Sequence, residues 1–326
     1  MKAVPSVLRT GVVAWIASAA ALLLPCAGRS DSVGGQAGRF VAADQATSAL
    51  VIHAGLPGAD RAPLWRWDPA KDPGLSAGSA ASFHNIDECK PVDGGRTILV
   101  CASGGGVAAV DVAAGCARWC AFLPKPWAGP HSVERLPDGR VAVANSTGVD
   151  ALQLIDLNDA PLDPAKQTVV TALPVPGAHG VVWDADRNSL FVLGYTNLLE
   201  LAYRPEPMSV TVKRRWNYVA ACGDAWGHDL VADGRGGYYL TNHTAVWRFD
   251  PDTGVFAREL DRPNVKSFSR DAVKGDLLAI PRESWWTDRL LVRTSDGALR
   301  TIGPFPGARF YKARWMDVSV SVRSAE

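Results

Sequence analysis

Four histidines stand at a nearly constant interval in this sequence. They are His84, His131, His179 and His228, separated by 47, 48 and 49 residues. Each follows a loop that contains proline, glycine or aromatic residues, and each precedes a short apolar run. Neutral imidazole binds metal ions, and its pKa near neutrality also suits it to acid–base catalysis. Because a structural repeat places equivalent residues at equivalent points, we expect these side chains to surround one centre.

The interval belongs to a repeat of short strands. After each histidine a strand leads to an Asp/Gly turn, such as Pro137–Arg140, and then to an apolar strand, a polar cluster and a third strand. Turns of this composition between alternating apolar runs are typical of hairpins. No long helical periodicity follows residue 30, which disfavours a parallel α/β fold. Periods of roughly 40–50 residues with about four strands indicate propeller blades.

The two ends of the repeat predict how the ring closes. Residues 39–43, 49–52 and 64–67 read as the second, third and fourth strands of a blade that lacks its first strand. Residues 309–315 form a lone strand at the other end. We therefore predict an all-β, six-bladed β-propeller whose C-terminal strand supplies the inner strand of the first blade. Tyr311 then takes the ring position in that blade, and Lys266 or Ser267 takes it in the sixth.

The first 28 residues are typical of a secretory signal peptide. Lys2 and Arg9 precede or flank the apolar stretch 11–24, and small residues follow it. That stretch is short for a membrane span, so no transmembrane segment is expected. The predicted organisation is a signal peptide over 1–28 and a single propeller domain over 38–318. A secreted or periplasmic protein is expected, with lipid anchoring at Cys26 as the less favoured alternative.

The charge and cysteine content of the chain limit the classes of partner and cross-link that are expected. Without Lys2 and Arg9 the chain has 32 basic and 33 acidic residues, and no basic stripe appears, so nucleic-acid binding is not expected. We expect a monomer. In an exported protein disulfides are permitted, and Cys116 and Cys120 are close enough in sequence to bridge.

The expected topology places a site at one mouth of the axial channel. The loops before the first strands and after the second strands should share one rim, whereas turn residues alone should occupy the opposite face. Functional residues commonly lie on loops held by a rigid scaffold. The candidate ligand-binding residues at this rim are Asn145, Tyr195, Asn197, Asn242, Trp127, Trp226, Trp285 and Trp286.

Three interpretations of the histidines stay open. They could hold a divalent metal ion through His84, His131, His179 and His228, they could move protons, or they could form structural hydrogen bonds that close the channel. Histidine-bound metals commonly have carboxylates behind the ligands. Asp87 and Glu134 follow their histidines by three residues and are expected on the other strand face, which weakens the metal interpretation.

The sequence resembles a known group of proteins at several short motifs. These are Ala43-Asp44-Gln45, His131-Ser132-Val133, Gly227-His228-Asp229 and Tyr311–Trp315. Over residues 38–318 the chain resembles a family of exported bacterial six-bladed propellers of largely unknown function. Its architecture is also similar to that of propeller polysaccharide lyases, in which axial histidines, an arginine and sometimes a metal act on uronic acids. Likeness of fold alone does not fix function.

The function expected from these features is β-elimination on a uronate-containing glycan. His131 or His179 would be the base, Arg282 or a histidine-bound metal would neutralise the carboxylate, and Tyr311 would donate a proton. Ordinary hydrolysis needs paired carboxylates, and the rim offers only Asp44 and Glu283. The alternatives are a non-catalytic propeller that binds glycan or protein, and a four-histidine iron oxygenase.

Overall fold

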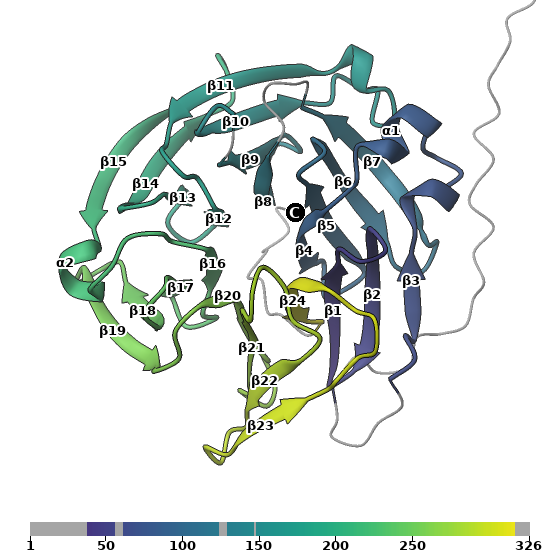
Figure 1. The fold of residues 1–326 in the computed structure, drawn as a ribbon. Coiled ribbons are helices and arrows are strands. Elements are labelled where there is room, and N and C mark those ends of the chain that lie inside the picture. The colour runs from purple at the N-terminus through teal and green to yellow at the C-terminus, as the bar shows by residue number, and fades with distance from the viewer. Residues whose placement is uncertain (1–37, 56–60, 124–128, 147, 317–326) are drawn as a thin grey trace, which may run out of the picture.

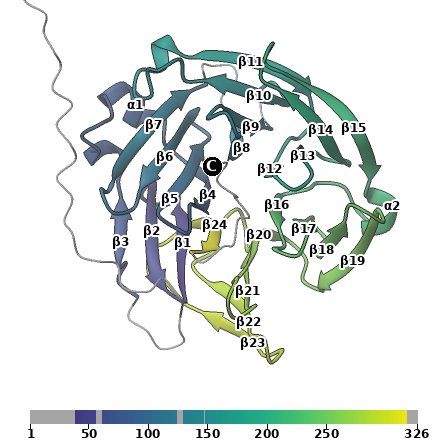
Figure 2. The same ribbon diagram turned by 180° about the vertical axis from the view of Figure 1, so that it is seen from behind.

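The computed structural model describes residues 38–55, 61–123, 129–146 and 148–316 of this chain. These residues form six four-stranded antiparallel sheets arranged as blades around a central axis (Figures 1 and 2). The predicted all-β, six-bladed propeller is therefore confirmed. The signal peptide predicted over 1–28, with Cys26, and Trp127 lie outside the described residues.

Each blade runs from an inner strand at the axis to an outer strand at the rim. The inner strands are β24 (Phe310–Trp315), β4 (Ile86–Val92), β8 (Pro130–Arg135), β12 (Gly180–Asp184), β16 (Asp229–Ala232) and β20 (Val265–Arg270). The second strands are β1 (Arg39–Asp44), β5 (Thr97–Ala102), β9 (Val141–Asn145), β13 (Ser189–Leu193), β17 (Tyr238–Thr241) and β21 (Leu277–Pro281).

The two outer layers follow the same order. The third strands are β2 (Ala49–Ala54), β6 (Gly106–Asp111), β10 (Ala151–Asp156), β14 (Asn197–Arg204), β18 (Val246–Asp250) and β22 (Leu290–Arg293). The fourth strands are β3 (Trp65–Trp67), β7 (Cys116–Phe122), β11 (Thr168–Pro174), β15 (Ser209–Asn217), β19 (Val255–Leu260) and β23 (Leu299–Ile302). The described helices are single turns: α1 (Ala77–Ala81), α2 (Val219–Cys222), η1 (Pro69–Lys71) and η2 (Pro164–Lys166).

The predicted hairpin turns have the backbone that their composition requires. In the turn between β8 and β9, Gly139 has a φ of 86°, and in the turn between β20 and β21, Gly275 has a φ of 78°. A positive φ is strained for residues with a Cβ atom, so glycine at these positions lets adjacent strands connect tightly.

The ring closes through β24. This strand pairs antiparallel with β1, with Phe40 opposite Trp315 and Ala42 opposite Ala313, and it lies innermost in the first blade (Figure 1). The C-terminal end of the described chain thus completes the sheet begun by its N-terminal end, as predicted. An inner strand from the far end ties the first and last blades together and removes an open sheet edge.

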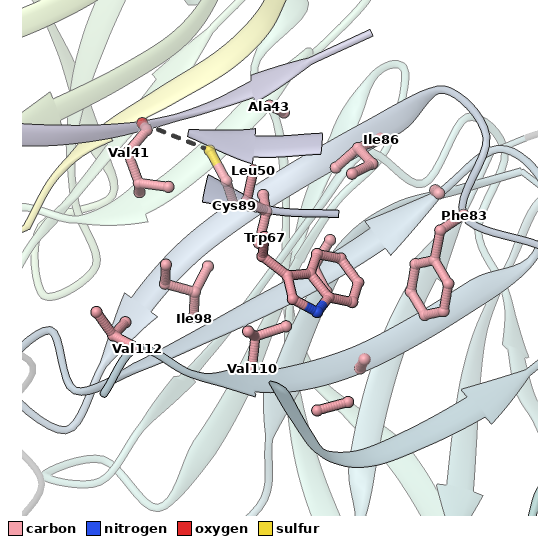
Figure 3. Close-up of a cluster of buried hydrophobic side chains, with 14 of the residues drawn as sticks. Val41, Ala43, Leu50, Trp67, Phe83, Ile86, Cys89, Ile98, Val110 and Val112 are labelled. Carbon is pink, nitrogen blue, oxygen red and sulfur yellow. Dashed lines mark hydrogen bonds between the residues drawn. The ribbon is translucent and has the colours of Figure 1, made fainter. Parts of the chain in front are cut away.

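Hydrophobic clusters fill the spaces between neighbouring blades. Figure 3 shows one of them, in which Trp67 and Val41 of the first blade pack with Phe83, Ile98 and Val110 of the second. The indole of Trp67 is about 1% exposed and its Nε1–H donates to Asp72 Oδ2 at 2.7 Å, so its one polar atom is satisfied.

One cysteine prediction is wrong. Cys120 carries a free, buried thiol while Cys116 is disulfide-bonded, so the two do not bridge each other. In β7 both residues pair with β6, Cys116 opposite Asp111 and Cys120 opposite Ala108. An extended strand holds residues four positions apart at more than 12 Å, beyond the reach of a disulfide. Cys89 and Cys101 are also free and buried.

A buried ion network lies on the axis and joins β24 to two other blades. The Arg314 guanidinium donates to Asp229 Oδ2 at 2.5 Å and to Glu88 Oε1 at 3.0 Å, and Lys312 Nζ lies 3.3 Å from Glu88 and 3.2 Å from Asp229. All four side chains are at most 2% exposed. Burial alone would raise the pKa of Glu88 and of Asp229, but Arg314 and Lys312 lower both, so both carboxylates stay ionised.

We predict that Arg314→Met destabilises the fold by about 3–5 kcal/mol, because it leaves Asp229 and Glu88 buried with one cation between them. Arg300→Met, at an exposed position in β23, is the matched control and should change stability by less than about 0.5 kcal/mol. Chemical denaturation followed by tryptophan fluorescence measures both. Equal midpoints for the two variants would mean that the network does not hold the ring closed.

Candidate functional site at the axial mouth

The inner strands begin at one mouth of the channel, and the structure corrects which residues occupy equivalent positions there. In β8 the pairing with β9 shifts between Pro130 and Ser132, which leaves His131 at a bulge. The same shift in β4 leaves Asp87 at the bulge, and the shift in β20 leaves Lys266 there. The equivalent of His131 in the second blade is therefore Asp87 and not His84.

The ring of six is completed by three further residues. His179 and His228 directly precede β12 and β16, and their backbone N–H groups donate to Leu193 and Thr241 of the second strands. Tyr311 lies where the pairing of β24 with β1 shifts. We name Asp87, His131, His179, His228, Lys266 and Tyr311 the axial ring. The prediction that Asp87 points to the other face was wrong, because the bulge turns it toward the axis.

Side-chain contacts connect the axial ring. The centroids of His131 and His179 are 4.4 Å apart, those of His179 and His228 are 5.7 Å apart, and those of His131 and Tyr311 are 6.1 Å apart. Lys266 Nζ lies 3.4 Å from His228 Nδ1 and 5.3 Å from the centroid of the Tyr311 ring. Three of the four periodic histidines are thus brought together.

The fourth histidine lies apart from them. His84 is exposed in the loop between α1 and β4, and its Nδ1 lies 3.2 Å from the Ala81 carbonyl oxygen. Its spacing in the sequence reflects the length of the segment between β3 and β4, which contains α1, and not its place on the strand. Glu134, in contrast, does point away from the mouth, since it pairs with Lys90 at 3.1 Å further along the channel.

Burial keeps the ring histidines neutral. It lowers the pKa of His131 to about 4 and that of His228 to about 2, and it lowers the pKa of His179 well below its usual value. The Nδ1 atoms of His131 and His179 lie 2.8 and 2.9 Å from the carbonyl oxygens of Gly129 and Gly177. A carbonyl only accepts, so Nδ1 bears the proton and Nε2 keeps a free lone pair. Both imidazoles can therefore accept a proton at Nε2.

Two cations share one exposed indole beside the histidines. Lys266 Nζ lies 5.6 Å and the Arg282 guanidinium 5.4 Å from the centroid of the Trp285 ring, and Trp285 is 59% exposed. Among the described residues no carboxylate lies within salt-bridge distance of either cation. Burial first, and then Arg282 and Lys312, lower the pKa of Lys266 to about 7. Without a salt-bridge partner in the described part of the chain, the pair favours the binding of an anion.

Asp87 supplies an acid at the same mouth. Ser103 Oγ and Gln45 Nε2 donate to its two carboxylate oxygens, the latter at 2.9 Å. Burial nevertheless raises the pKa of Asp87 to about 7. Gln45 in turn accepts a hydrogen bond from the indole of Trp286, so the carboxyl group is fixed by a chain that reaches the rim.

Aromatic side chains form one wall of the mouth. Tyr195 lies between His179 and Trp226, at centroid distances of 6.2 and 4.5 Å, and Trp226 stacks on His243 at 5.9 Å. His243 Nδ1 lies 3.5 Å from Asp224 Oδ2. Trp226 is 47% exposed. This wall offers flat apolar faces to a ligand.

The three predicted asparagines are engaged in local structure. Asn145 is buried and donates to Gln153 at 2.9 Å. Asn242 is buried, donates to the Asp224 carbonyl, and accepts from the Trp247 indole at 3.1 Å. Asn197 donates to the adjacent Thr196 hydroxyl at 2.7 Å. Asn242 therefore shapes the loop that carries Asp224 and Trp226.

The four periodic histidines are poorly arranged to bind a metal ion together. No group of three His, Cys, Asp or Glu side chains among the described residues is arranged to hold a metal ion. With His84 exposed, the four-histidine set is not assembled. The metal stays a prediction.

Comparison with known proteins agrees with this architecture. The chain matches a family of unknown function, DUF6528, over residues 30–323. The chain belongs to this family. The match confirms the resemblance to six-bladed propellers of unknown function that the sequence motifs indicated. No curated protein matches the chain.

Solved propeller structures resemble this member of DUF6528 in fold alone. A protein of unknown function from Bacteroides caccae is 11% identical, with a TM-score of 0.55, and the match covers 85% of this chain and 97% of that one. A chain of a nidogen/laminin complex is 11% identical, with a TM-score of 0.54 and the same coverage. The Cps50 (Swd1) propeller domain of Myceliophteria thermophila is 14% identical, with a TM-score of 0.52, covering 82% and 83%.

The described residues include no helix long and apolar enough to cross a membrane.

Sequence reasoning missed Asp87, although a signal for it exists. The turn that ends at Arg96 in the second blade matches the turn that ends at Arg140 in the third, which is 44 residues later. Asp87 and His131 are also 44 residues apart. Alignment on the turns, which have strict backbone requirements, finds the equivalent residue, whereas alignment on the histidines does not.

We predict that stability rises between pH 7 and pH 10 because of Lys266. Its folded pKa of about 7 lies below the unfolded value near 10.4, so the unfolded state binds more protons in this window. Lys266→Met should remove up to about 2–4 kcal/mol of this rise. Lys274→Met, at an exposed position, should leave it unchanged. Denaturation curves across this pH range measure the effect, and parallel profiles for wild type and Lys266→Met would contradict it.

Proposed function

We propose that the axial mouth binds and cleaves a uronate-containing glycan by β-elimination. The observation that carries the proposal is the pair of basic groups, Lys266 and Arg282, which form no salt bridge with any described residue. They lie beside two neutral imidazoles with free Nε2 atoms. Elimination needs a cationic group for the carboxylate and a base for the adjacent proton. These groups occur together here, and Trp226 and Trp285 offer faces for sugar rings.

The roles follow from charge and tautomer. The substrate carboxylate would lie against Arg282 and Lys266, and its charge would favour the protonated form of Lys266. Neutralised in this way, the carboxylate makes the C5 proton more acidic. His131 or His179 would take that proton at Nε2, since its Nδ1–H is already held by a glycine carbonyl. General-base catalysis of this kind contributes about 10²–10⁴-fold to the rate.

The leaving group needs a proton. The Tyr311 hydroxyl keeps its proton, since burial and then the charge of Asp87 raise its pKa well above the usual value. It would protonate the glycosidic oxygen as the C4–O bond breaks, while the electrons of the C5–H bond form the C4=C5 double bond. The products are a new chain end with a hydroxyl and an unsaturated uronate. Asp87, with a pKa of about 7, would be the nearby acid that returns the proton to Tyr311.

A hydrolytic alternative has less support. Hydrolysis by inversion or retention uses two carboxyl groups on opposite sides of the bond. Asp87 is the buried carboxyl group of the axial ring. Of the two predicted rim carboxylates, Glu283 is exposed, and Asp44 caps a turn by accepting from Thr47 and the Ala46 backbone.

Non-catalytic binding is the second candidate. The exposed indoles of Trp226 and Trp285 favour it, because flat aromatic faces at a rim suffice to hold a sugar without turnover. In that case Trp226→Ala and Trp285→Ala would weaken glycan binding, and no product would form.

We predict that purified protein generates the ultraviolet absorbance of a C4–C5 unsaturated uronate from at least one of polygalacturonate, alginate and hyaluronan. His131→Ala and His179→Ala should lower kcat by about 10²-fold or more. Arg282→Gln should raise KM and also lower kcat, since Arg282 binds the substrate carboxylate and neutralises it while the C5 proton is removed.

His84→Ala separates this proposal from the metal-based alternatives. Elimination by the axial ring predicts unchanged activity, whereas a four-histidine metal centre predicts its loss. Iron at one equivalent per chain together with dioxygen uptake would support the oxygenase. If His131→Ala and His179→Ala retained full lyase activity, the proposed roles would be wrong.

A further inference from the structure

The opposite mouth of the channel contains a cavity, contrary to the expectation that turn residues alone occupy this face. Its volume is about 290 Å³. The late residues of the inner strands line it, among them Lys90, Val182, Val231, Arg270 and Arg314. The axial ring lies at the start of the same strands, so the buried ion network separates this cavity from the candidate active site.

Most of the charges that line the cavity are already paired with each other. Lys90 lies 3.1 Å from Glu134 and also donates to the Val181 carbonyl at 2.8 Å. Arg187 lies 3.2 Å from Asp184, whose carboxylate also accepts from the Tyr238 hydroxyl. Each of these ion pairs is neutral overall, so it exerts little electrostatic attraction on a charged ligand.

One cationic group lacks such a partner. Among the described residues Arg270 makes no salt bridge, and it is half-buried at the end of β20. Arg314, in contrast, is about 1% exposed and is already paired with Asp229 and Glu88. The unpaired charge at this mouth is therefore that of Arg270, and it favours an anionic ligand.

The remaining walls are apolar or aromatic. Pro91, Val182, Trp183, Val231 and Ala232 contribute them. Gly234, Gly236 and Gly237 form an edge without side chains, and there the backbone approaches the cavity closely. The exposed carboxylate of Asp186 at the margin disfavours ligands with more than one negative charge.

From these features we infer a second ligand site at this mouth, for a small organic acid with one carboxylate and a flat apolar body. The carboxylate accepts from Arg270, and the body packs against Trp183, Val182 and Val231. A cavity of this size suits a single-ring compound, since pockets for drug-sized ligands start at about 300 Å³. The site lies at the other end of the channel and does not rest on the proposed lyase activity.

Benzoate is the probe that tests this inference, measured by isothermal titration calorimetry on the full chain. Benzyl alcohol has the ring without the charge, and acetate has the charge without the ring. We expect benzoate to bind with a Kd below about 1 mM and both partial analogues to bind about tenfold or more weakly, as expected when one charge-assisted hydrogen bond or one packed ring is lost.

Variants at the two mouths of the channel show where benzoate binds. Arg270→Gln should weaken benzoate about tenfold, and Ala232→Trp should block it, because the exposed Ala232 can carry an indole that fills the cavity. Arg282→Gln, at the other mouth, is the matched control and should leave benzoate binding unchanged.

The inference is overturned if benzoate fails to bind at about 10 mM, if acetate binds as tightly as benzoate, or if Arg282→Gln weakens binding and Arg270→Gln does not. The last result would assign the anion to the axial ring instead. Lyase assays on the same variants keep the two sites distinguishable, since Ala232→Trp should leave turnover unaffected.

Discussion

The ion network on the axis is the interaction on which the rest of the molecule depends. Lys312 and Arg314 arrive on β24, from the far end of the chain, and meet Glu88 of β4 and Asp229 of β16 in the interior. Two cations and two carboxylates, each nearly inaccessible, are tolerable only together, because one buried unpaired charge costs several kcal/mol. The network therefore couples closure of the ring to the correct placement of three blades.

The same network determines what lies at each mouth. Lys312 Nζ donates to the carbonyl oxygen of His131 at 3.0 Å, so the strand that closes the ring also fixes the backbone of an axial histidine. Its charge helps to keep the pKa values of Lys266, His131 and His228 low. At the other end Arg314 forms part of a cavity wall. The two mouths thus share one charged core but present different chemistry.

The axial ring has the properties of a reactive site more than of a structural closure. A device that merely closes a channel would repeat one side chain around the axis. Here the six blades contribute a carboxyl group, three imidazoles, an amine and a phenol, and burial brings the pKa of both Asp87 and Lys266 to about 7. Perturbed groups of unlike type gathered at one mouth are characteristic of functional sites.

The sequence by itself determined the fold. Turns such as Pro137–Arg140 fix where strands end, their spacing gives the blades, and the lone strand at residues 310–315 has no place except in the incomplete first blade. Turn-forming residues and the alternation of apolar and polar residues are local features, so they predict the blades without the structure. The same reasoning found His131, His179, His228 and Tyr311, which all lie in the axial ring.

Tertiary structure alone decided the rest. Whether His84 or Asp87 faces the axis depends on a one-residue bulge in β4, and a one-residue shift moves every side chain to the other face of a strand. The pairing of Lys266 with Arg282 over Trp285 joins parts of one blade that the chain separates by a hairpin. The cavity at the far mouth arises from residues on all six inner strands and adjoining turns. Such convergence depends on how the blades pack around the axis, and no local pattern in the chain encodes it.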